Sequence, residues 1–477
     1  MTSRHHHRGY LVLRTPSGGG VARGPAGQLP LGAAPGSNSA RQRRRWYAPV
    51  RWKFAFALAA AIAWMVLSIV LARGWQAQLG EVVGDTAAWL IIGGIAVVPG
   101  FMNAFLIASL LVDRRPPARE LPQSLPGISI LVAAYNEADN ILGTLESIDR
   151  QRYPGPLQVI VVDDGSTDAT AQRLAEVRYA WLEVIHLSPN GGKSHALNVA
   201  LARAEHALTI TVDADSYLYR NALRNLVARY LSDPPGTAAV AGAVLVRNSR
   251  ENFVTRAQEW DYFHGIAAIK RLQSLYQGTL VAQGAFSLYE TRLLRQVGGW
   301  PHCVGEDIVL TWDLLERGYR VGFAENACLF TNAPNTWRQF IRQRQRWSRG
   351  LIEAFKLHWR LLFKPRMTTL FIWWNLLFPY LDVVYTCVFI PGLVLALFGI
   401  YWIAGPMTLL VLPLALLVNF VMFRIQSRMF TEQGLRVRRN VLGFVFYALG
   451  YSLVLQPACV VGYLQEFLYR TKHWGTK

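Results

Sequence analysis

Long apolar runs lie towards both ends of the chain, and short apolar runs separated by polar residues fill its middle. A helix of about 18 or more mostly apolar residues is long enough to cross a bilayer. Runs that reach or approach this length lie at residues 54–71, 87–112, 371–400, 407–423 and 441–463. Pro379 and Pro391 would kink the third run or divide it into an interfacial piece and a span. The pattern therefore predicts two transmembrane helices before the central region and about three after it.

The central region alternates between short apolar runs and helical patterns. The runs that predict buried strands lie at residues 128–132, 157–162, 184–187 and 208–212. Residues 139–150 and 169–177 predict two of the helices between them. This alternation is typical of an α/β fold with a doubly wound, mostly parallel sheet, in which ligands bind beyond the carboxyl ends of the strands. We expect the polar residues that follow these strands to meet at one edge, namely Tyr135, Asp163, Asp164, Asp213 and Asp215.

The charge and the cysteine content restrict the classes of protein to which the chain can belong. The 477 residues carry a formal net charge of +19, and 52% of them are hydrophobic. Lys and Arg gather beside the apolar runs, as at 41–53 and 424–440, which indicates the cytosolic flanks of membrane spans and argues against a nucleic-acid partner. The four cysteines form no CxxC pair and lie far apart, which argues against a zinc site and a disulfide framework. We expect a multi-pass plasma-membrane protein in contact with membrane lipids.

The basic residues also predict a topology. The connection at 75–86 lacks Lys and Arg, so it lies outside, and the N-terminus and residues 113–365 lie in the cytosol. Counting the crossings places the C-terminus outside, whereas its basic residues favour the cytosol; a re-entrant helix would remove this conflict. The predicted segments are a disordered basic tail at 1–45, two transmembrane helices at 46–112, a cytosolic α/β domain at 113–335, an amphipathic interface helix at 336–366, and about three transmembrane helices at 367–477.

The predicted interface helix combines aromatic and basic residues. Trp337, Phe340, Trp347 and Trp359 recur at helical spacing, and arginines lie between them. A basic amphipathic helix of this kind can lie in the membrane interface. An ordinary helix on the surface of the cytosolic domain is the alternative.

Two carboxylates separated by one residue follow the fourth predicted strand. Asp213 and Asp215 point the same way if this segment is extended. Paired carboxylates can hold a divalent cation, Mg²⁺ or Mn²⁺, that neutralises a diphosphate leaving group. A lone Asp-x-Asp also occurs by chance, and its position after a buried strand and downstream of another Asp pair favours the functional interpretation.

Asp163-Asp164-Gly165-Ser166 follows the second predicted strand and favours a turn, since Asp, Gly and Ser are turn residues. Its functional interpretation is recognition of a base and ribose, with the Tyr135 ring available for stacking. Lys193 follows two glycines in a loop suited to phosphate, although the spacing does not match a P-loop.

Glu306 and Asp307 open a predicted helix. Carboxylates there are stabilised by the helix dipole, so a capping role is one interpretation. The other is that Asp307 accepts the proton of an attacking hydroxyl as a general base. Arg346 and Trp347 form an adjacent guanidinium and indole, which could hold a diphosphate and line a sugar site.

Five ordered motifs resemble those of the processive family-2 glycosyltransferases, the membrane synthases of cellulose, chitin, hyaluronan and poly-β-1,6-N-acetylglucosamine. They lie within about residues 125–350 and comprise Tyr135-Asn136-Glu137, Asp163-Asp164-Gly165-Ser166, Asp213-Ala214-Asp215, Gly305-Glu306-Asp307 and Gln343-x-x-Arg346-Trp347. The fourth motif, Gly305-Glu306-Asp307, stands where the family more commonly has Thr-Glu-Asp, and this form is found in the poly-N-acetylglucosamine branch. The resemblance implies a GT-A fold embedded between transmembrane helices, an inverting transfer from a UDP-sugar, a divalent metal, and extrusion of the product through the enzyme's own helices.

The resemblance also assigns roles by position. It implies Asp307 as the catalytic base, with Glu306 beside it, and Asp215 as the metal ligand. The implied residues that bind the donor are Tyr135, Glu137, Asp163, Asp164, Lys193 and Asp213. The implied residues around the donor diphosphate and the acceptor end are Gln343, Arg346 and Trp347. Gln283 and Gly284 fall where the family lines its acceptor site, although the resemblance at these two positions is weaker.

These implications lead to an expected function. We expect a processive enzyme that polymerises a UDP-sugar, with UDP-N-acetylglucosamine first among the donors, and extrudes an exopolysaccharide of the kind found in biofilms. Its partners would be the donor, the growing polysaccharide and membrane lipids, and a small membrane accessory subunit is left open. The alternatives are another polymer (hyaluronan, chitin or cellulose), transfer of one sugar to polyprenyl phosphate or another lipid, and a membrane transporter with a nucleotide-sensing domain.

Overall fold

The computed structural model describes residues 47–114, 122, 124–276, 278–405 and 440–468, together with residues 408, 416, 417, 419–424, 427, 430 and 431. The predicted tail at 1–45, much of the predicted span at 407–423 and the basic residues of the C-terminus lie outside the described residues.

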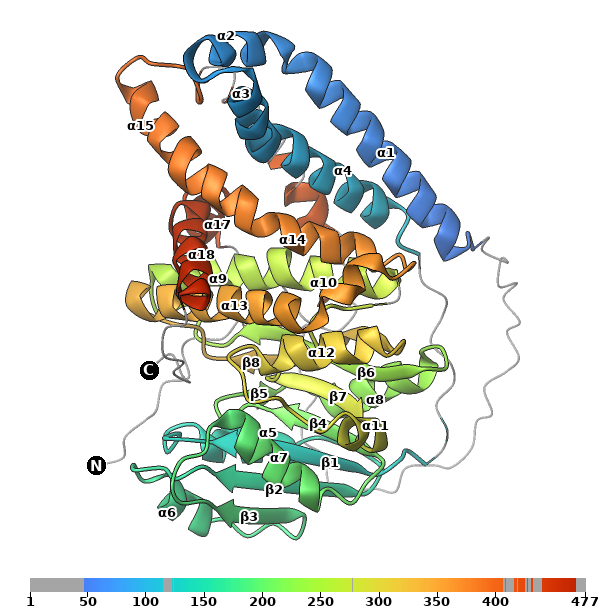
Figure 1. Cartoon of the computed structure of the whole chain (residues 1–477). Helices are drawn as coiled ribbons and strands as arrows, with labels where there is room; N and C mark the ends of the chain where they lie inside the picture. Colours follow the sequence, from blue (N-terminus) through green and yellow to red (C-terminus); the bar gives the residue numbers. More distant parts are fainter. Residues whose placement is uncertain are drawn as a thin grey trace, which may run out of the picture.

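Three layers follow one another along the long axis of the molecule (Figure 1). A mixed sheet with its covering helices forms one end, and long apolar helices form the other. Between them lies a layer of helices that includes α13 (Trp337–His358) and α10 (Ala267–Leu275). The sheet domain therefore meets the apolar helices through this middle layer.

The sheet has eight strands in the order β3-β2-β1-β4-β7-β6-β8-β5. Their bounds are β1 Ile128–Ala134, β2 Leu157–Asp163, β3 Leu182–His186, β4 Leu208–Val212, β5 Tyr217–Leu218, β6 Thr237–Val246, β7 Phe286–Glu290 and β8 Arg320–Thr331. Strands β1 to β4 pair in parallel, whereas β7 runs antiparallel to both β4 and β6. The predicted α/β fold with a mostly parallel sheet is confirmed: four of the seven pairings are parallel.

Apolar sequence explains the position of the central strands. Every residue of β1 and of β4 is buried, as expected for strands covered on both faces. The helices of this domain are α5 Ile141–Asp149, α6 Thr170–Ala175, α7 Lys193–Arg203, α8 Ala222–Ser232, α9 Phe253–Trp260, η2 Asp261–Ile266, α11 Thr291–Gln296 and α12 Glu306–Glu316. The predicted helices at 139–150 and 169–177 correspond to α5 and α6, each shorter than predicted.

Three helices among the described residues are long and apolar enough to cross a membrane. They are α1 Val50–Leu71, the continuous helix Asp85–Leu111 built from α3 (Asp85–Ile92), η1 (Gly93–Val97) and α4 (Val98–Leu111), and the continuous helix Thr369–Leu397 built from α14 (Thr369–Val384), η4 (Tyr385–Phe389) and α15 (Ile390–Leu397). Pro379 and Pro391 lie inside the last of these, which is not divided. The connection predicted at 75–86 is mostly a helix, α2 (Arg73–Val83), and not an extended loop.

The last predicted span is a bent pair of helices. α17 (Val441–Leu449) and α18 (Tyr451–Phe467) meet at an angle of 51° around Gly450, which fits a broken span or a re-entrant loop. A re-entrant loop here would resolve the conflict between the number of crossings, which places the C-terminus outside, and its basic residues, which favour the cytosol. The number of crossings at this end stays a prediction.

The amphipathic helix predicted at 336–366 is α13 followed by a short 3₁₀ helix, η3 (Trp359–Phe363). Thr336 caps its start by accepting a hydrogen bond from the Gln339 N–H. α13 contacts α12 on the sheet side and α18 on the side of the apolar helices. Gly462 permits the second contact, because a Cβ there would lie 2.0 Å from the Ser348 hydroxyl oxygen. α13 is therefore packed between α12 and α18.

Candidate active site

The loops after β1 and β2 are joined where these strands end. Ala134 and Asp163 pair in register at the last position of the two strands. Beyond them Asn136, with a φ of 55°, donates its N–H to Ser166 Oγ at 3.0 Å and accepts from the Thr167 N–H at 2.8 Å. Tyr135 and Glu137 flank Asn136, so the two motifs that the sequence placed at one edge of the sheet are held together there.

The two aspartates at the end of β2, Asp163 and Asp164, have different partners. Asp163 accepts a hydrogen bond from the Ser166 N–H at 3.1 Å, and its other oxygen lies 3.0 Å from His186 Nδ1. The Asp164 carboxylate is fully buried and accepts from the backbone N–H groups of Gly191 and Gly192, at 2.9 and 2.7 Å. Asp164 therefore fixes the glycine loop that leads into Lys193. Neither this role nor His186 was predicted from the sequence.

Lys193 is the first residue of α7 and joins two of the acidic motifs. Its Nζ donates a hydrogen bond to Asp213 Oδ1 at 2.6 Å and lies 3.8 Å from Glu306 Oε1. Burial acts to lower the pKa of Lys193, but the charges of Asp213 and Glu306 outweigh burial and raise it. Lys193 is therefore held as a cation between two motifs that are about 90 residues apart in the sequence.

Glu306 and Asp307 occupy the first turn of α12, and Gly305 is the N-cap residue. Glu306 is almost fully buried, and burial raises its pKa to about 7, against the effect of Lys193. Asp307 accepts from the Gly284 N–H at 3.3 Å and from the Ile308 N–H at 2.8 Å. The helix start thus stabilises the carboxylate without making Asp307 the cap.

Gln283 and Gly284 lie against the same cluster. Gln283 donates a hydrogen bond to the Gly242 carbonyl, and its buried Oε1 has no hydrogen-bond partner among the described residues. A Cβ on Gly284 would lie 2.9 Å from Lys193 Nζ, so a side chain there would displace the end of the lysine. Gly284 therefore lies against Lys193 and also donates its N–H to Asp307, and its role at an acceptor site stays a prediction.

A glycine pair brings α13 against the start of α12. A Cβ on Gly305 would lie 2.5 Å from the Gly350 Cα, which no side chain could tolerate without a backbone shift. The Gly305 N–H also donates to Glu353 Oε2 at 2.9 Å. This contact gives a physical reason for glycine where the resemblance leads one to expect threonine.

Arg346 and its neighbours lie one turn before this contact. The Arg346 charge is close enough to lower the pKa of Glu306 and to act on Lys193. Trp347 is 39% exposed, and its ring centre lies 6.4 Å from that of Tyr262. Gln343 Oε1 is buried with no hydrogen-bond partner in the described part of the chain. α13 therefore presents a cation and an accessible aromatic ring beside the acidic cluster.

Asp213 and Asp215 follow β4 with the buried Ala214 between them. Asp215 accepts hydrogen bonds from the Thr331 and Ser216 hydroxyls, at 3.1 and 3.3 Å. The described residues hold no cluster of three or more His, Cys, Asp or Glu that could bind a metal by itself. Mg²⁺ is commonly held by one or two carboxylates together with phosphate oxygens of a substrate. Residues 213–216 form a turn and not the extended segment in which the two side chains would point the same way, so joint coordination by Asp213 and Asp215 stays a prediction.

Lys270 was not predicted as a site residue. It lies close enough to Asp307 for the two charges to interact. It is buried on α10, where its Nζ donates to the Val281 carbonyl at 3.1 Å. Burial lowers the pKa of Lys270 to about 7, against the opposing charge of Asp307. In the sequence Lys270 stands beside Arg271, so no local pattern distinguished it from a surface residue.

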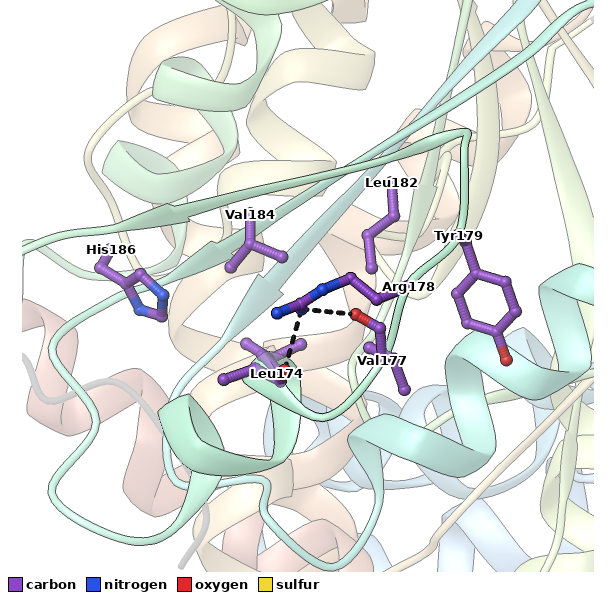
Figure 2. Close-up of a pocket in the computed structure, with 8 residues that line it drawn as sticks. Leu174, Val177, Arg178, Tyr179, Leu182, Val184 and His186 are labelled. Atoms are coloured by element: carbon purple, nitrogen blue, oxygen red, sulfur yellow. Dashed lines mark hydrogen bonds between the residues drawn. The ribbon is translucent and has the colours of Figure 1, made fainter.

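A pocket of about 260 Å³ lies between α6 and β3, at the edge of the sheet (Figure 2). The Arg178 guanidinium lies across it and donates hydrogen bonds to the carbonyls of Ala175 and Val177. His186 lines its far end, and none of the site residues predicted from the sequence lines it. His186, which lines this pocket, also contacts Asp163.

The central part of the chain is similar in sequence to known proteins. Residues 126–350 match the family described as Glycosyltransferase like family 2. The chain is 28% identical over 277 residues to the poly-β-1,6-N-acetyl-D-glucosamine synthase of Staphylococcus epidermidis, and 31% identical over 228 residues to that of Staphylococcus aureus. These alignments cover 58% and 47% of this chain, and 66% and 55% of the relatives' own lengths. The chain thus spans less than two thirds of these relatives.

The fold has a counterpart among solved structures. The mannosyltransferase PcManGT from Pyrobaculum calidifontis, solved in complex with GDP-Man and Mn²⁺, is 18% identical to this chain. The superposition has a TM-score of 0.50 and covers 89% of this chain and all of that one. The predicted GT-A fold is confirmed.

Proposed function

We propose that the chain is a family 2 glycosyltransferase that polymerises a UDP-sugar processively, with inversion at the anomeric carbon, and extrudes the product across the membrane. The match of residues 126–350 to the family 2 glycosyltransferase model supports the first part of this proposal. The donor proposed first is UDP-N-acetylglucosamine, and the product is then a poly-N-acetylglucosamine. This choice of sugar is supported by the names of the staphylococcal relatives.

The contact of Lys193 with both Asp213 and Glu306 carries the proposal. It joins two acidic motifs around one cation, and α13 adds the Arg346 charge to the same cluster. Two fixed cations beside paired carboxylates suit a metal-bound diphosphate, because the cations stabilise the charge that develops as the sugar leaves. Tyr135 and Asp163 lie beyond the neighbouring strand ends, where the base and ribose would bind.

Asp307 is the proposed general base. Its carboxylate accepts hydrogen bonds from the N–H groups of Gly284 and Ile308, which fixes its direction. In this mechanism Asp307 takes the proton of the acceptor hydroxyl, that oxygen bonds to the anomeric carbon, and the bond to the diphosphate breaks. Lys193 and Arg346 stabilise the departing UDP, and Trp347 lines the acceptor side.

Asp213 and Asp215 are the residues that would hold a divalent cation. The GDP-Man complex of the mannosyltransferase contains Mn²⁺, which supports a divalent cation in general. When bound, such a cation neutralises the charge of the diphosphate. Lys193 lies 2.6 Å from Asp213 and keeps that carboxylate in place from the other side.

The position of α13 relative to the apolar helices supports the proposed extrusion of the product. α13, which carries Arg346 and Trp347, lies between the sheet domain and the apolar helices (Figure 1). With the catalytic domain in the cytosol, as the basic flanks predict, the product would leave the site directly into the membrane region.

Transfer of one sugar to polyprenyl phosphate or another lipid is the second candidate, because the same charged cluster would serve it. Trp347 favours polymer synthesis, since an accessible ring beside the base offers a sugar-stacking surface. A transporter with a nucleotide-sensing domain would release no UDP from any UDP-sugar.

The test is to incubate the purified full-length protein with each UDP-sugar separately, with Mg²⁺ or Mn²⁺, and to size the product. We expect UDP release and a long polymer with UDP-N-acetylglucosamine. Products that carry a single added sugar on a lipid would replace the proposal with the second candidate.

A further inference from the structure

A buried arginine lies inside the motif that carries Arg346 and Trp347. Arg344 is only 4% exposed. Its Nη2 donates hydrogen bonds to Asp261 Oδ2 at 2.8 Å and to the Tyr451 hydroxyl at 3.1 Å. The Tyr451 hydroxyl donates in turn to the same Asp261 oxygen, at 2.9 Å. These side chains come from α13, η2 and α18, and they form one buried charged network.

The same guanidinium contacts two aromatic rings. Arg344 Cζ lies 4.1 Å from the centre of the Trp347 ring and 5.0 Å from that of the Phe340 ring. Attraction between a guanidinium and an aromatic ring is stronger where water is excluded. Phe340 is fully buried, whereas Trp347 is 39% exposed, so Arg344 supports the inner side of a ring that solvent still reaches.

The π-helix η2 is built to receive this network. It begins at Asp261, which binds Arg344, and continues with Tyr262, whose ring lies against Trp347. A Cβ on Gly265 would lie 2.9 Å from Asp261 Oδ1, so a glycine there leaves room for the carboxylate. Single turns of π-helix often mark functional positions. Two consecutive residues of η2 thus act on the same segment of α13.

We propose that Arg344 is a positioning residue that holds the Trp347 ring in place for the end of the growing chain, and that Asp261 and Tyr451 hold Arg344. The inference rests on the proposed function, because it takes the exposed face of Trp347 as the surface on which the acceptor sugar stacks. Without the guanidinium plane the ring can turn, so the acceptor dissociates sooner and the product is shorter. The hydrogen bonds among Arg344, Asp261 and Tyr451 do not include Lys193, so we expect the donor to keep its affinity.

Arg344→Lys in the purified full-length protein tests this, because lysine keeps the charge beside Asp261 and removes the flat guanidinium. The measurements are KM for UDP-N-acetylglucosamine, KM for a short β-1,6-linked glucosaminyl oligosaccharide, and product length. We expect the acceptor KM to rise by about 3- to 30-fold, the donor KM to change by less than about twofold, and the product to shorten. Arg342→Lys is the matched control, since Arg342 is exposed on the same helix, and it should match the wild type.

A second variant keeps the test decisive if Arg344→Lys does not fold. Tyr451→Phe removes one hydroxyl from the network and keeps the ring, and it should change the acceptor KM in the same direction by a smaller factor. Combined with Trp347→Phe, Arg344→Lys should add less than its effect alone, since both changes act on one ring. Equal changes in donor and acceptor KM, or no change in either, would overturn the inference. A wild type that makes no polymer from any UDP-sugar would overturn both it and the proposed function.

Discussion

Lys193 Nζ lies 2.6 Å from Asp213 Oδ1 and 3.8 Å from Glu306 Oε1, in surroundings from which water is largely removed. At the scale of the residue, such a site depends on matching each buried charge with another, because an unpaired buried charge is strongly destabilising. The buried carboxylate of Asp164 is stabilised instead by hydrogen bonds from two backbone N–H groups. The charges of the site are therefore held in place before any substrate binds.

Asp307→Asn tests the proposed base. The amide keeps the size of the side chain and cannot accept the hydroxyl proton, so we expect kcat to fall by about 100- to 10,000-fold while UDP affinity stays close to that of the wild type. Turnover and UDP binding are measured on the same preparation. Asp313→Asn, in the same helix and paired with Arg317, is the control. Normal turnover by Asp307→Asn would remove the assignment.

Glu306 predicts a pH dependence of stability. Burial raises its pKa to about 7, from 4.5 for an exposed glutamate. Between these values the folded protein retains a proton that the unfolded chain has released, so this group's contribution to stability falls as pH rises. Thermal unfolding at pH 5 and pH 8 should show a larger fall in Tm for the wild type than for Glu306→Gln. Parallel falls in Tm would contradict this account; Glu146→Gln, exposed on α5, is the control.

At the scale of the element, the contact between α12 and α13 decides whether the base and Arg346 share one site. Gly305 and Gly350 allow the two backbones to approach until a Cβ on either would lie within 2.7 Å of the other's Cα. The Glu353 carboxylate adds a hydrogen bond to the Gly305 N–H. A small displacement of α13 would move Arg346 and Trp347 together, away from Asp307.

Gly350→Ala should therefore separate the two helices. Forcing a methyl group into a closely packed contact costs about 1–3 kcal/mol, and we expect reduced activity together with a lower Tm. Gly143→Ala in α5 is the matched control, because a Cβ there meets no atom within 4 Å. Wild-type activity in Gly350→Ala would show that the close contact has no part in catalysis.

The sequence predicted some elements well and others poorly, for physical reasons. The parallel strands β1 to β4 were predicted because each is a short apolar run followed by polar residues. The strands β5 to β8 were not, since β6 and β8 are long and β7 pairs antiparallel with neighbours distant in sequence. The candidate site residues within the five motifs were identified from the sequence. Lys270, His186 and Arg344 were not identified, because their contacts are tertiary and no local sequence pattern indicates them.

At the scale of the whole molecule, α18 joins the C-terminal helices to the sheet domain through α13. Glu466 is buried and paired with Arg349, at 3.3 Å, and with Lys356, at 3.0 Å. Gly462 brings the two helices into close contact. The helices on the membrane side are thus fixed to the segment that carries Arg346 and Trp347, which is the arrangement that passage of a product from site to bilayer requires.

Glu466→Gln should weaken this junction. It removes the buried carboxylate charge that Arg349 and Lys356 both contact, and we expect a clearly lower Tm. Glu183→Gln removes one partner of an exposed pair with Arg203, and it should cost less than about 1 kcal/mol. Equal Tm values for the two variants would contradict the structural role given to Glu466.

The most direct test of the central claim is an experimental structure of the full-length protein with UDP and Mn²⁺. The account predicts the diphosphate between Lys193 and Arg346, the cation at Asp213 and Asp215, and the base near Tyr135 and Asp163. Density for UDP elsewhere, such as in the pocket between α6 and β3, with Lys193 still bound only to Asp213 and Glu306, would contradict it.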